Sequence, residues 1–254
     1  MTIKAVSFDL WDTLVIDDSD EIERGKRGLR TKKEERRHLV WEALSRHGEI
    51  ELDSVRLAYN VADAAFNKVW HDQHVTWPIE DRLRVLLAGL GQTLPADELA
   101  AVVRAHQVME VEIPPAPMPA VAATLATLRQ RYKLCVTSDA VVTPGTELRR
   151  LLAKHQLDRH FDAFVFSDEV GHSKPHPSVF EAVAKALNVA LPEIVHVGDR
   201  QHNDVAGPQR LGMKTVLFVG SRAVDRDQST ADAICAHLSE LPAAIRRIAE
   251  QPTV

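Results

Sequence analysis

Apolar residues follow two different patterns along this chain, and the change between them divides the sequence. Short apolar runs predict strands at residues 5–8, 134–136, 164–166, 194–197 and 215–219. Helical patterns follow three of these runs, near residues 147–155, 177–187 and 204–211. Strands that alternate with helices are typical of βαβ units, so we predict an α/β protein with a mainly parallel sheet.

The residues between the first two runs have a helical pattern instead. Thr31 and Glu34 have the spacing of a capping box and open a first helix. Apolar residues then recur at helical spacing through about residue 90, and Pro95 opens a further helix. The proline-rich stretch 113–117 cannot be helical throughout and suits a crossing back to the sheet. We therefore predict a core of residues 1–17 and 117–254 with an all-helical cap of residues 18–116.

Composition and charge narrow the class of protein. The chain has 254 residues, of which 45% are hydrophobic, so a sizeable core is expected. A net charge of −5 argues against a dedicated nucleic-acid binder. We expect no membrane segment, because no apolar stretch approaches roughly 20 residues. The absence of a basic-then-apolar leader, together with only two cysteines, Cys135 and Cys235, predicts a cytoplasmic protein with reduced thiols.

Polar side chains stand where the predicted strands end. Asp9 follows the run 5–8, Ser138 and Asp139 follow the run that starts at 134, and Asp199 follows the run 194–197. The carboxyl ends of parallel strands meet at one edge of an open sheet, where such sheets bind ligands. Taken alone, Asp199 and the nearby Asp204 are as easily explained as caps of the following helix, since Asp is a favoured N-cap.

The order of these residues resembles the four motifs of the haloacid dehalogenase superfamily: a nucleophilic Asp9, the hydroxyl of Ser138, Lys174 before Pro175, and the pair Asp199 and Asp204. The longer string 167–175, which reads SDEVGHSKP, closely resembles the third-motif region of that superfamily. The resemblance implies a Rossmann-like core with a helical cap inserted after the first motif, and a hydrolase activity.

The resemblance also implies a chemistry for the site. Asp9 would attack phosphorus to give an aspartyl-phosphate, which water then hydrolyses. Mg²⁺ would be held by Asp9, by the backbone carbonyl of Trp11, by Asp199 and by Asp204, the last directly or through water. The expected substrate is a small anionic molecule, a phosphorylated metabolite.

Four residues are implied to bind that substrate: Thr13, Ser138, Asp139 and Lys174. Ser138 would donate a hydrogen bond to the phosphoryl group, and Lys174 would neutralise phosphoryl oxygens and orient Asp9. Thr13 would act through the tight turn after the first strand. Asp139 stands where the family commonly has Asn, and it adds negative charge near the phosphate.

Trp11 departs from the commonest phosphatase pattern, which has a second Asp two residues after the nucleophile. That Asp protonates the leaving oxygen, and losing such a group typically costs about a hundred- to ten-thousandfold in rate. Three hypotheses stay open: a Mg²⁺-dependent phosphatase, a metal-independent 2-haloacid dehalogenase, and a binding or regulatory protein of this fold with impaired catalysis. Dehalogenases carry an aromatic residue at this position but lack the Gly-Asp found here at residues 198–199.

The predicted cap also carries a run of basic residues and three tryptophans. The run 24–37 is strongly basic, and we expect most of its cations to form a solvated surface, with some facing the site. Trp41, Trp70 and Trp77 are expected to belong mainly to the core of the cap, although one could roof the pocket.

Overall fold

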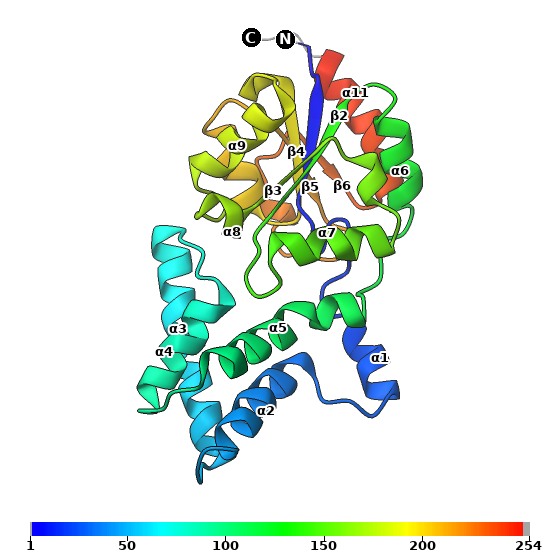
Figure 1. The fold of residues 1–254 in the computed structure, drawn as a ribbon. Coiled ribbons are helices and arrows are strands. Elements are labelled where there is room, and N and C mark those ends of the chain that lie inside the picture. Colours follow the sequence, from blue (N-terminus) through cyan, green and yellow to red (C-terminus); the bar gives the residue numbers. More distant parts are fainter. Residues whose placement is uncertain (1, 251–254) are drawn as a thin grey trace.

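A six-stranded parallel sheet forms the centre of the core, in the upper half of the molecule as Figure 1 shows it. The computed structural model describes residues 2–250. The strands lie in the order β3-β2-β1-β4-β5-β6, and every neighbouring pair is parallel. Their bounds are β1 Ala5–Phe8, β2 Lys133–Ser138, β3 Ala163–Phe166, β4 Ile194–Gly198, β5 Lys214–Phe218 and β6 Ala233–Cys235. The predicted α/β class is confirmed.

Helices cover both faces of the sheet. Val6 and Phe8 of β1 pack on one face, with α6 (Val121–Leu128), α7 (Gly145–Lys154) and α11 (Leu241–Glu250). Ala5 packs on the other face, with α9 (Pro177–Leu187). Side chains of a strand alternate between the two faces, and both faces here are buried. This explains why the strands read as continuous apolar runs in the sequence.

Five helices between β1 and β2 form the inserted cap (Figure 1). They are α1 Asp20–Lys26, α2 Lys32–Ser45, α3 Leu52–Gln73, α4 Ile79–Gly89 and α5 Ala96–Glu112. The last four share a hydrophobic cluster of their own, separate from the clusters of the sheet. Thr31 caps α2, because its side chain accepts a hydrogen bond from the Glu34 backbone N–H at 3.2 Å. The all-helical cap is confirmed, whereas its boundaries at residues 18 and 116 stay a prediction.

The structure departs from the predicted elements in two places. Helix α1 was not expected, because its sequence carries charged residues without an apolar stripe. The segment predicted as one helix at 204–211 instead begins with the π-helical residues Gln201–Ala206 and continues as the short helix α10, Gly207–Gln209. Pro208 lacks a backbone N–H to continue the preceding hydrogen bonding. Gly212, at φ 79°, ends the segment as predicted.

The cap touches the core on two sides of the sheet edge. On one side, the Thr143 hydroxyl of the loop after β2 donates a hydrogen bond to the Glu110 carboxylate of α5. On the other, the Ser173 backbone N–H donates to the His74 carbonyl of the α3–α4 loop at 2.8 Å. In the described part of the chain, the helices all fall short of the length and apolar character that a membrane crossing requires.

Candidate active site

Three neighbouring strands place the predicted residues at one edge of the sheet. Asp9 follows β1, Asp139 follows β2 and Asp199 follows β4, and β1 lies between the other two. Lys174 comes from the loop between α8 (Ser167–Val170) and α9. All of these side chains are buried: Asp9 is 7% exposed and Lys174 is 4% exposed. The sequence motifs therefore converge, although they are spread over almost the whole chain.

Lys174 is the cation at the centre of this group. Its Nζ lies 2.6 Å from Asp9 Oδ1 and 2.6 Å from Asp204 Oδ1. Burial alone would lower the pKa of Lys174, but the carboxylates of Asp204, Asp9 and Asp139 raise it above its usual range. The lysine therefore stays charged and cannot act as a base. It holds Asp9 in one position while cancelling part of its charge.

Asp139 supports that lysine through the backbone. Its Oδ1 accepts a hydrogen bond from the Lys174 backbone N–H at 2.9 Å. Burial raises the pKa of Asp139 to about 7, although Lys174 opposes the shift. Near neutral pH, part of the population would then carry no charge at Asp139.

Ser138 and Thr13 are fully buried beside the site rather than in its cavity. The Ser138 hydroxyl faces the Asp139 carbonyl at 3.4 Å. Thr13 Oγ1 has no hydrogen-bond partner among the described residues. Their expected contacts with a substrate stay a prediction.

Asp9, Asp199 and Asp204 form a tight cluster of carboxylates. One oxygen from each lies within 4.8 Å of the others. A side chain at Gly198 would collide with Asp204, so the close approach of these segments requires glycine. Burial raises the pKa of Asp9 to about 6 and that of Asp199 to about 8, and the neighbouring carboxylates add to both shifts.

These carboxylates suit a divalent cation that prefers oxygen ligands. Asp199 Oδ2 is buried and has no hydrogen-bond partner among the described residues. A buried carboxylate oxygen without a partner is costly, and an ion at this point would supply the missing charge. The residues therefore fit the predicted Mg²⁺, with Asp9 and Asp199 offering the open oxygens.

Asp204 differs from the other two because hydrogen-bond donors occupy both of its oxygens. Oδ1 accepts from Lys174 and from His196 Nε2, the latter at 3.2 Å, and Oδ2 accepts from the Arg200 backbone N–H at 3.0 Å. Burial alone would raise its pKa, but Lys174 and His196 lower it below the usual range. Asp204 therefore stays ionised and acts as the fixed partner of Lys174.

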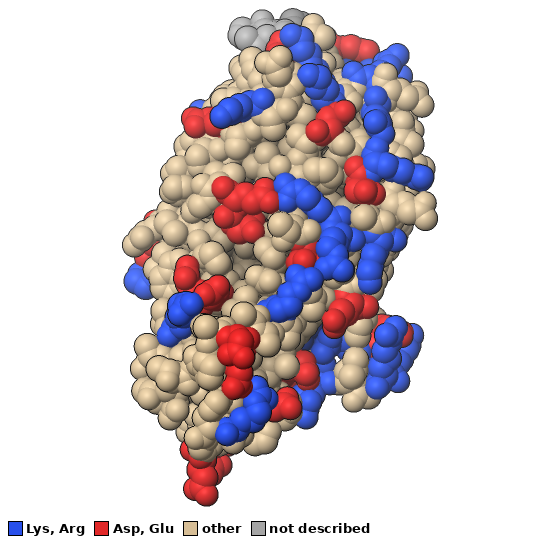
Figure 2. All heavy atoms as spheres, viewed as in Figure 1, with Lys and Arg blue, Asp and Glu red and all other residues tan. Residues whose placement is uncertain are grey.

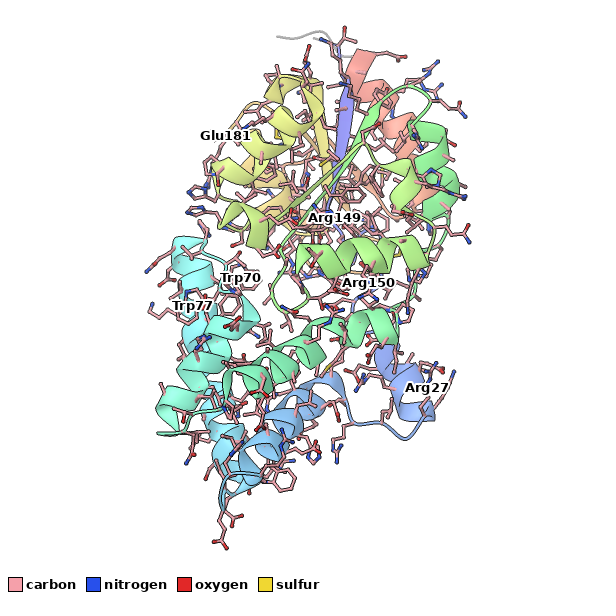
Figure 3. The ribbon with its side chains drawn as sticks, in the orientation of Figure 1. Arg27, Trp70, Trp77, Arg149, Arg150 and Glu181 are labelled. Carbon is pink, nitrogen blue, oxygen red and sulfur yellow. The ribbon has the colours of Figure 1, made fainter. Side chains whose placement is uncertain are left out.

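A cavity of about 340 Å³ opens above Asp9, Asp139 and Lys174. Its far wall comes from the cap and includes Arg36 and Trp70. Figure 3 shows Trp70 near the end of α3, where the cap approaches the core. Of the three cap tryptophans, Trp41, Trp70 and Trp77, Trp70 is thus the one that lines the cavity.

The basic run of the cap is less exposed than expected. Arg24, Lys32 and Arg37 are buried, and Lys32 and Arg36 line the cavity. Lys32 Nζ lies 2.8 Å from Asp20 Oδ1 and 3.5 Å from Glu110 Oε1. The sequence showed the basic run but not its partners, since Glu110 is 78 residues from Lys32. On the face seen in Figure 2, acidic and basic side chains are interspersed.

Trp11 and Asp12 follow each other in the turn after β1, but only Trp11 faces the cavity. Trp11 is half-buried against the core and lines the cavity. Asp12 has a positive φ of 56°, and its Oδ1 accepts a hydrogen bond from the Asp17 backbone N–H at 3.3 Å. The Asp12 side chain is thus held by its own loop and lies outside the cavity wall.

The family model described as haloacid dehalogenase-like hydrolase matches residues 3–212. The chain belongs to the haloacid dehalogenase-like hydrolases. The resemblance inferred from the motifs is therefore confirmed.

Curated relatives of this hydrolase include several phosphatases. The glyceraldehyde 3-phosphate phosphatase of Pyrococcus furiosus is 33% identical over 104 residues, which is 40% of this chain and 43% of the relative. The pyrophosphatase PpaX of Bacillus mycoides is 39% identical over 89 residues, or 35% of this chain and 39% of the relative. The chain thus matches less than half the length of these relatives.

Solved structures of the family share the fold over nearly the whole chain. A HAD phosphatase from Thermococcus onnurineus has a TM-score of 0.65 at 24% identity and covers 99% of this chain and 100% of its own. A 2-haloacid dehalogenase from Pseudomonas syringae has a TM-score of 0.66 at 23% identity and covers 97% of this chain and 99% of its own. The same fold thus occurs in proteins named for two different reactions, so the fold does not choose between them.

Proposed function

We propose that this hydrolase is a Mg²⁺-dependent phosphatase that acts on a small anionic phosphate ester. The observation that carries the proposal is the contact of Asp9 with Lys174 at 2.6 Å, beside the two further carboxylates Asp199 and Asp204. A lysine and a divalent cation together supply the positive charge that a carboxylate needs in order to approach a phosphate. The partial matches to curated phosphatases support the same reaction.

The reaction would proceed in two steps at Asp9. An Asp9 carboxylate oxygen forms a bond to phosphorus while the bond from phosphorus to the leaving oxygen breaks, which gives an aspartyl-phosphate. Water then attacks that phosphorus, and the bond to Asp9 breaks to release inorganic phosphate. Lys174 holds the Asp9 carboxylate and donates to phosphoryl oxygens, and Asp139 fixes the Lys174 backbone. Mg²⁺, when bound by Asp9, Asp199, Asp204 and the Trp11 carbonyl, would neutralise phosphoryl oxygens.

Ser138 and Thr13 are proposed to complete the phosphate pocket. Ser138 is the last residue of β2, directly before Asp139, and Thr13 lies in the turn after Asp9; both are buried. Substrate would have to draw the Ser138 hydroxyl away from the Asp139 carbonyl, a contact that at 3.4 Å is long for an O–H donor.

Metal-independent dehalogenation is the second candidate, because the aromatic Trp11 lines the cavity. In that reaction Asp9 would displace a halide from carbon, and halide leaves without a proton. The three-carboxylate cluster counts against it, since without a cation Asp199 Oδ2 is a buried carboxylate oxygen with no hydrogen-bond partner among the described residues.

A substrate screen distinguishes the two reactions. The purified protein is incubated with phosphate monoesters and with 2-haloacids, each with Mg²⁺ and with a chelator. We expect phosphate release that requires Mg²⁺. Halide release that persists in chelator would replace the proposal with dehalogenation, and turnover of neither class would favour a binding protein of this fold.

A further inference from the structure

Arg200 occupies the cavity wall directly after the carboxylate Asp199. It follows β4 and directly precedes the π-helical segment Gln201–Ala206, which carries Asp204. The cavity that Arg200 lines is also lined by Asp9 and Trp11. The Arg200 side chain is 46% exposed and lines the cavity, so it is not packed into the core.

The guanidinium of Arg200 is not committed to a partner. Within residues 2–250, its side chain makes no hydrogen bond, and its one ion pair joins Nε to Asp199 Oδ2 at 3.9 Å. Arg222 provides a comparison on the same carboxylate. Arg222 Nη1 is 4.0 Å from Asp199 Oδ2, but it also donates to Asp225 Oδ2 at 2.7 Å and to the Asp199 carbonyl at 3.3 Å. Arg200 therefore keeps free donors on the cavity wall, whereas Arg222 is held through Nη1 and does not line the cavity.

Arg200 is a cation by the chemistry of its side chain, because the arginine guanidinium is effectively always protonated in proteins. A planar guanidinium can donate two parallel hydrogen bonds to phosphate-type oxygens, and it remains a cation throughout a reaction. Such a group can stabilise charge on an oxygen but cannot protonate it.

Position 11 of this cavity lacks the carboxyl that protonates the leaving oxygen in the commonest phosphatase pattern. Trp11 stands where a carboxyl would protonate the leaving oxygen, and Asp12, the next residue, lies outside the cavity wall.

The other carboxylates that line the cavity all have partners. Asp139 accepts from the Lys174 backbone, and Asp204 accepts three donors. Asp17 accepts the Asp18 backbone N–H, Asp18 pairs with Lys32, and Glu110 accepts from Thr143 and Lys32. Among the described residues, Arg200 is the cation of the cavity wall whose side chain makes no hydrogen bond, so it is the one free to answer the charge on a departing oxygen.

We propose that Arg200 is a catalytic residue that stabilises the leaving oxygen electrostatically, in place of the proton donor that Trp11 cannot supply. This role rests on the proposed phosphatase function. As the phosphorus–oxygen bond breaks, its electron pair stays on the leaving oxygen, and hydrogen bonds from Arg200 hold that anion until water provides the proton. Arg200 itself gives up no proton. The enzyme should therefore be most active on esters whose leaving oxygen tolerates negative charge.

The test compares three variants across phosphate esters of rising leaving-group pKa, from aryl to alkyl, in saturating Mg²⁺. Arg200→Gln removes the charge, Arg200→Lys keeps the charge without the planar fork, and Arg222→Gln is the matched control on the same carboxylate. Removing one preorganised donor to a developing oxyanion typically costs about 10²–10³ in kcat. We expect a loss of that order for Arg200→Gln on alkyl esters, a loss of about tenfold or less on aryl esters, partial rescue by Arg200→Lys, and no change in leaving-group dependence for Arg222→Gln.

Several results would overturn this role. An equal loss on aryl and alkyl esters would show that Arg200 only binds substrate. Unchanged kinetics with tighter Mg²⁺ binding by calorimetry would show that Arg200 is merely a counter-charge for Asp199. If the parent protein releases phosphate and the Arg200 variants release it equally fast, this role alone is rejected. A parent protein that releases no phosphate from any ester would reject the proposed function and this role together.

Discussion

Ser7 and His196 face each other across the two central strands, and their side chains are joined by a hydrogen bond. The two residues are partners in the register of β1 and β4, and Ser7 Oγ lies 2.7 Å from His196 Nδ1. Both are fully buried. The other ring nitrogen, Nε2, contacts Asp204 at 3.2 Å. Because an ionised carboxylate only accepts, Nε2 carries the ring proton, and Ser7 donates to Nδ1.

This relation predicts that His196 positions Asp204 and, through it, Lys174. His196→Phe keeps a ring of similar size but leaves Asp204 with one donor fewer and Ser7 without its partner. Partners behind metal-binding residues typically contribute about 10- to 100-fold in affinity or activity. We expect losses in that range in Mg²⁺ affinity and kcat, measured by calorimetry and steady-state kinetics, and about 1–3 kcal/mol lower stability in urea from the unpaired groups. His196→Gln retains one donor and should recover part of the loss; equal behaviour of the two variants would contradict a positioning role.

Asp9→Asn should abolish hydrolysis while the protein stays folded. The amide is close in size but cannot form an acyl phosphate, so turnover should fall to the background of the assay. Asp12→Asn is the matched control from the same turn, because Asn tolerates the positive φ and its oxygen can still accept from the Asp17 backbone. Phosphate release is measured alongside circular dichroism. Activity near the parent level in Asp9→Asn would reject Asp9 as the nucleophile.

Asp199→Asn should have opposite effects on the metal-free and the metal-bound protein. Without the ion, folding raises the pKa of Asp199 to about 8, so near neutral pH this carboxyl must take up a proton on folding, a cost that the amide avoids. The melting temperature of the metal-free variant should therefore stay equal or rise. With Mg²⁺ present, the variant should lose most of the stabilisation that the ion gives the parent, since a ligand stabilises only as far as it binds. Melting curves across a Mg²⁺ titration measure both effects. An undiminished Mg²⁺-induced shift would place the ion elsewhere.

Trp11→Asp should raise turnover of alkyl phosphates more than turnover of aryl phosphates. The new carboxyl can protonate a poor leaving oxygen, a contribution typically about 10²–10⁴-fold when well placed. Because Trp11 packs against the core, the variant loses buried apolar contacts. Its melting curve should show a loss of stability of up to about 3–5 kcal/mol. Kinetics are therefore compared only at temperatures where both proteins are folded. A folded variant that gains equally on both ester classes would show that leaving-group protonation does not limit the reaction.

His106 should make the cap sensitive to acid. Burial lowers the pKa of His106 to about 4, and its Nδ1 contacts the Val102 carbonyl at 2.8 Å. The unfolded chain, with a His pKa near about 6.5, binds more protons between these values, so the free energy of unfolding falls as the pH drops from about 6.5 to about 4. The full effect is on the order of 3 kcal/mol. Urea unfolding at several pH values should show this slope in the parent and a shallower slope in His106→Phe. Identical slopes would show that His106 does not drive the acid sensitivity.

The local sequence determined the order of the helices and strands and the site residues that stand at the strand ends. Apolar runs that end at Asp9, Ser138 and Asp199 predicted both the strands and the edge at which these residues meet, because parallel strands present their carboxyl ends together. The helical cap followed from periodicity and from the capping box at Thr31 and Glu34. Helix α1 escaped prediction because its residues give no apolar period.

Only the tertiary structure determines which polar and charged side chains contact one another. The Ser7–His196–Asp204 chain depends on the register of β1 against β4, which no local pattern of residues encodes. The contact of Glu110 with Lys32 likewise depends on how α5 packs against α2, and it buries a lysine that the sequence placed in a solvated run. Motifs can be read residue by residue, since each reflects its own strand or turn. Burial, pKa and the free donors of Arg200 arise from neighbours distant in sequence, and they exist only once the chain has folded.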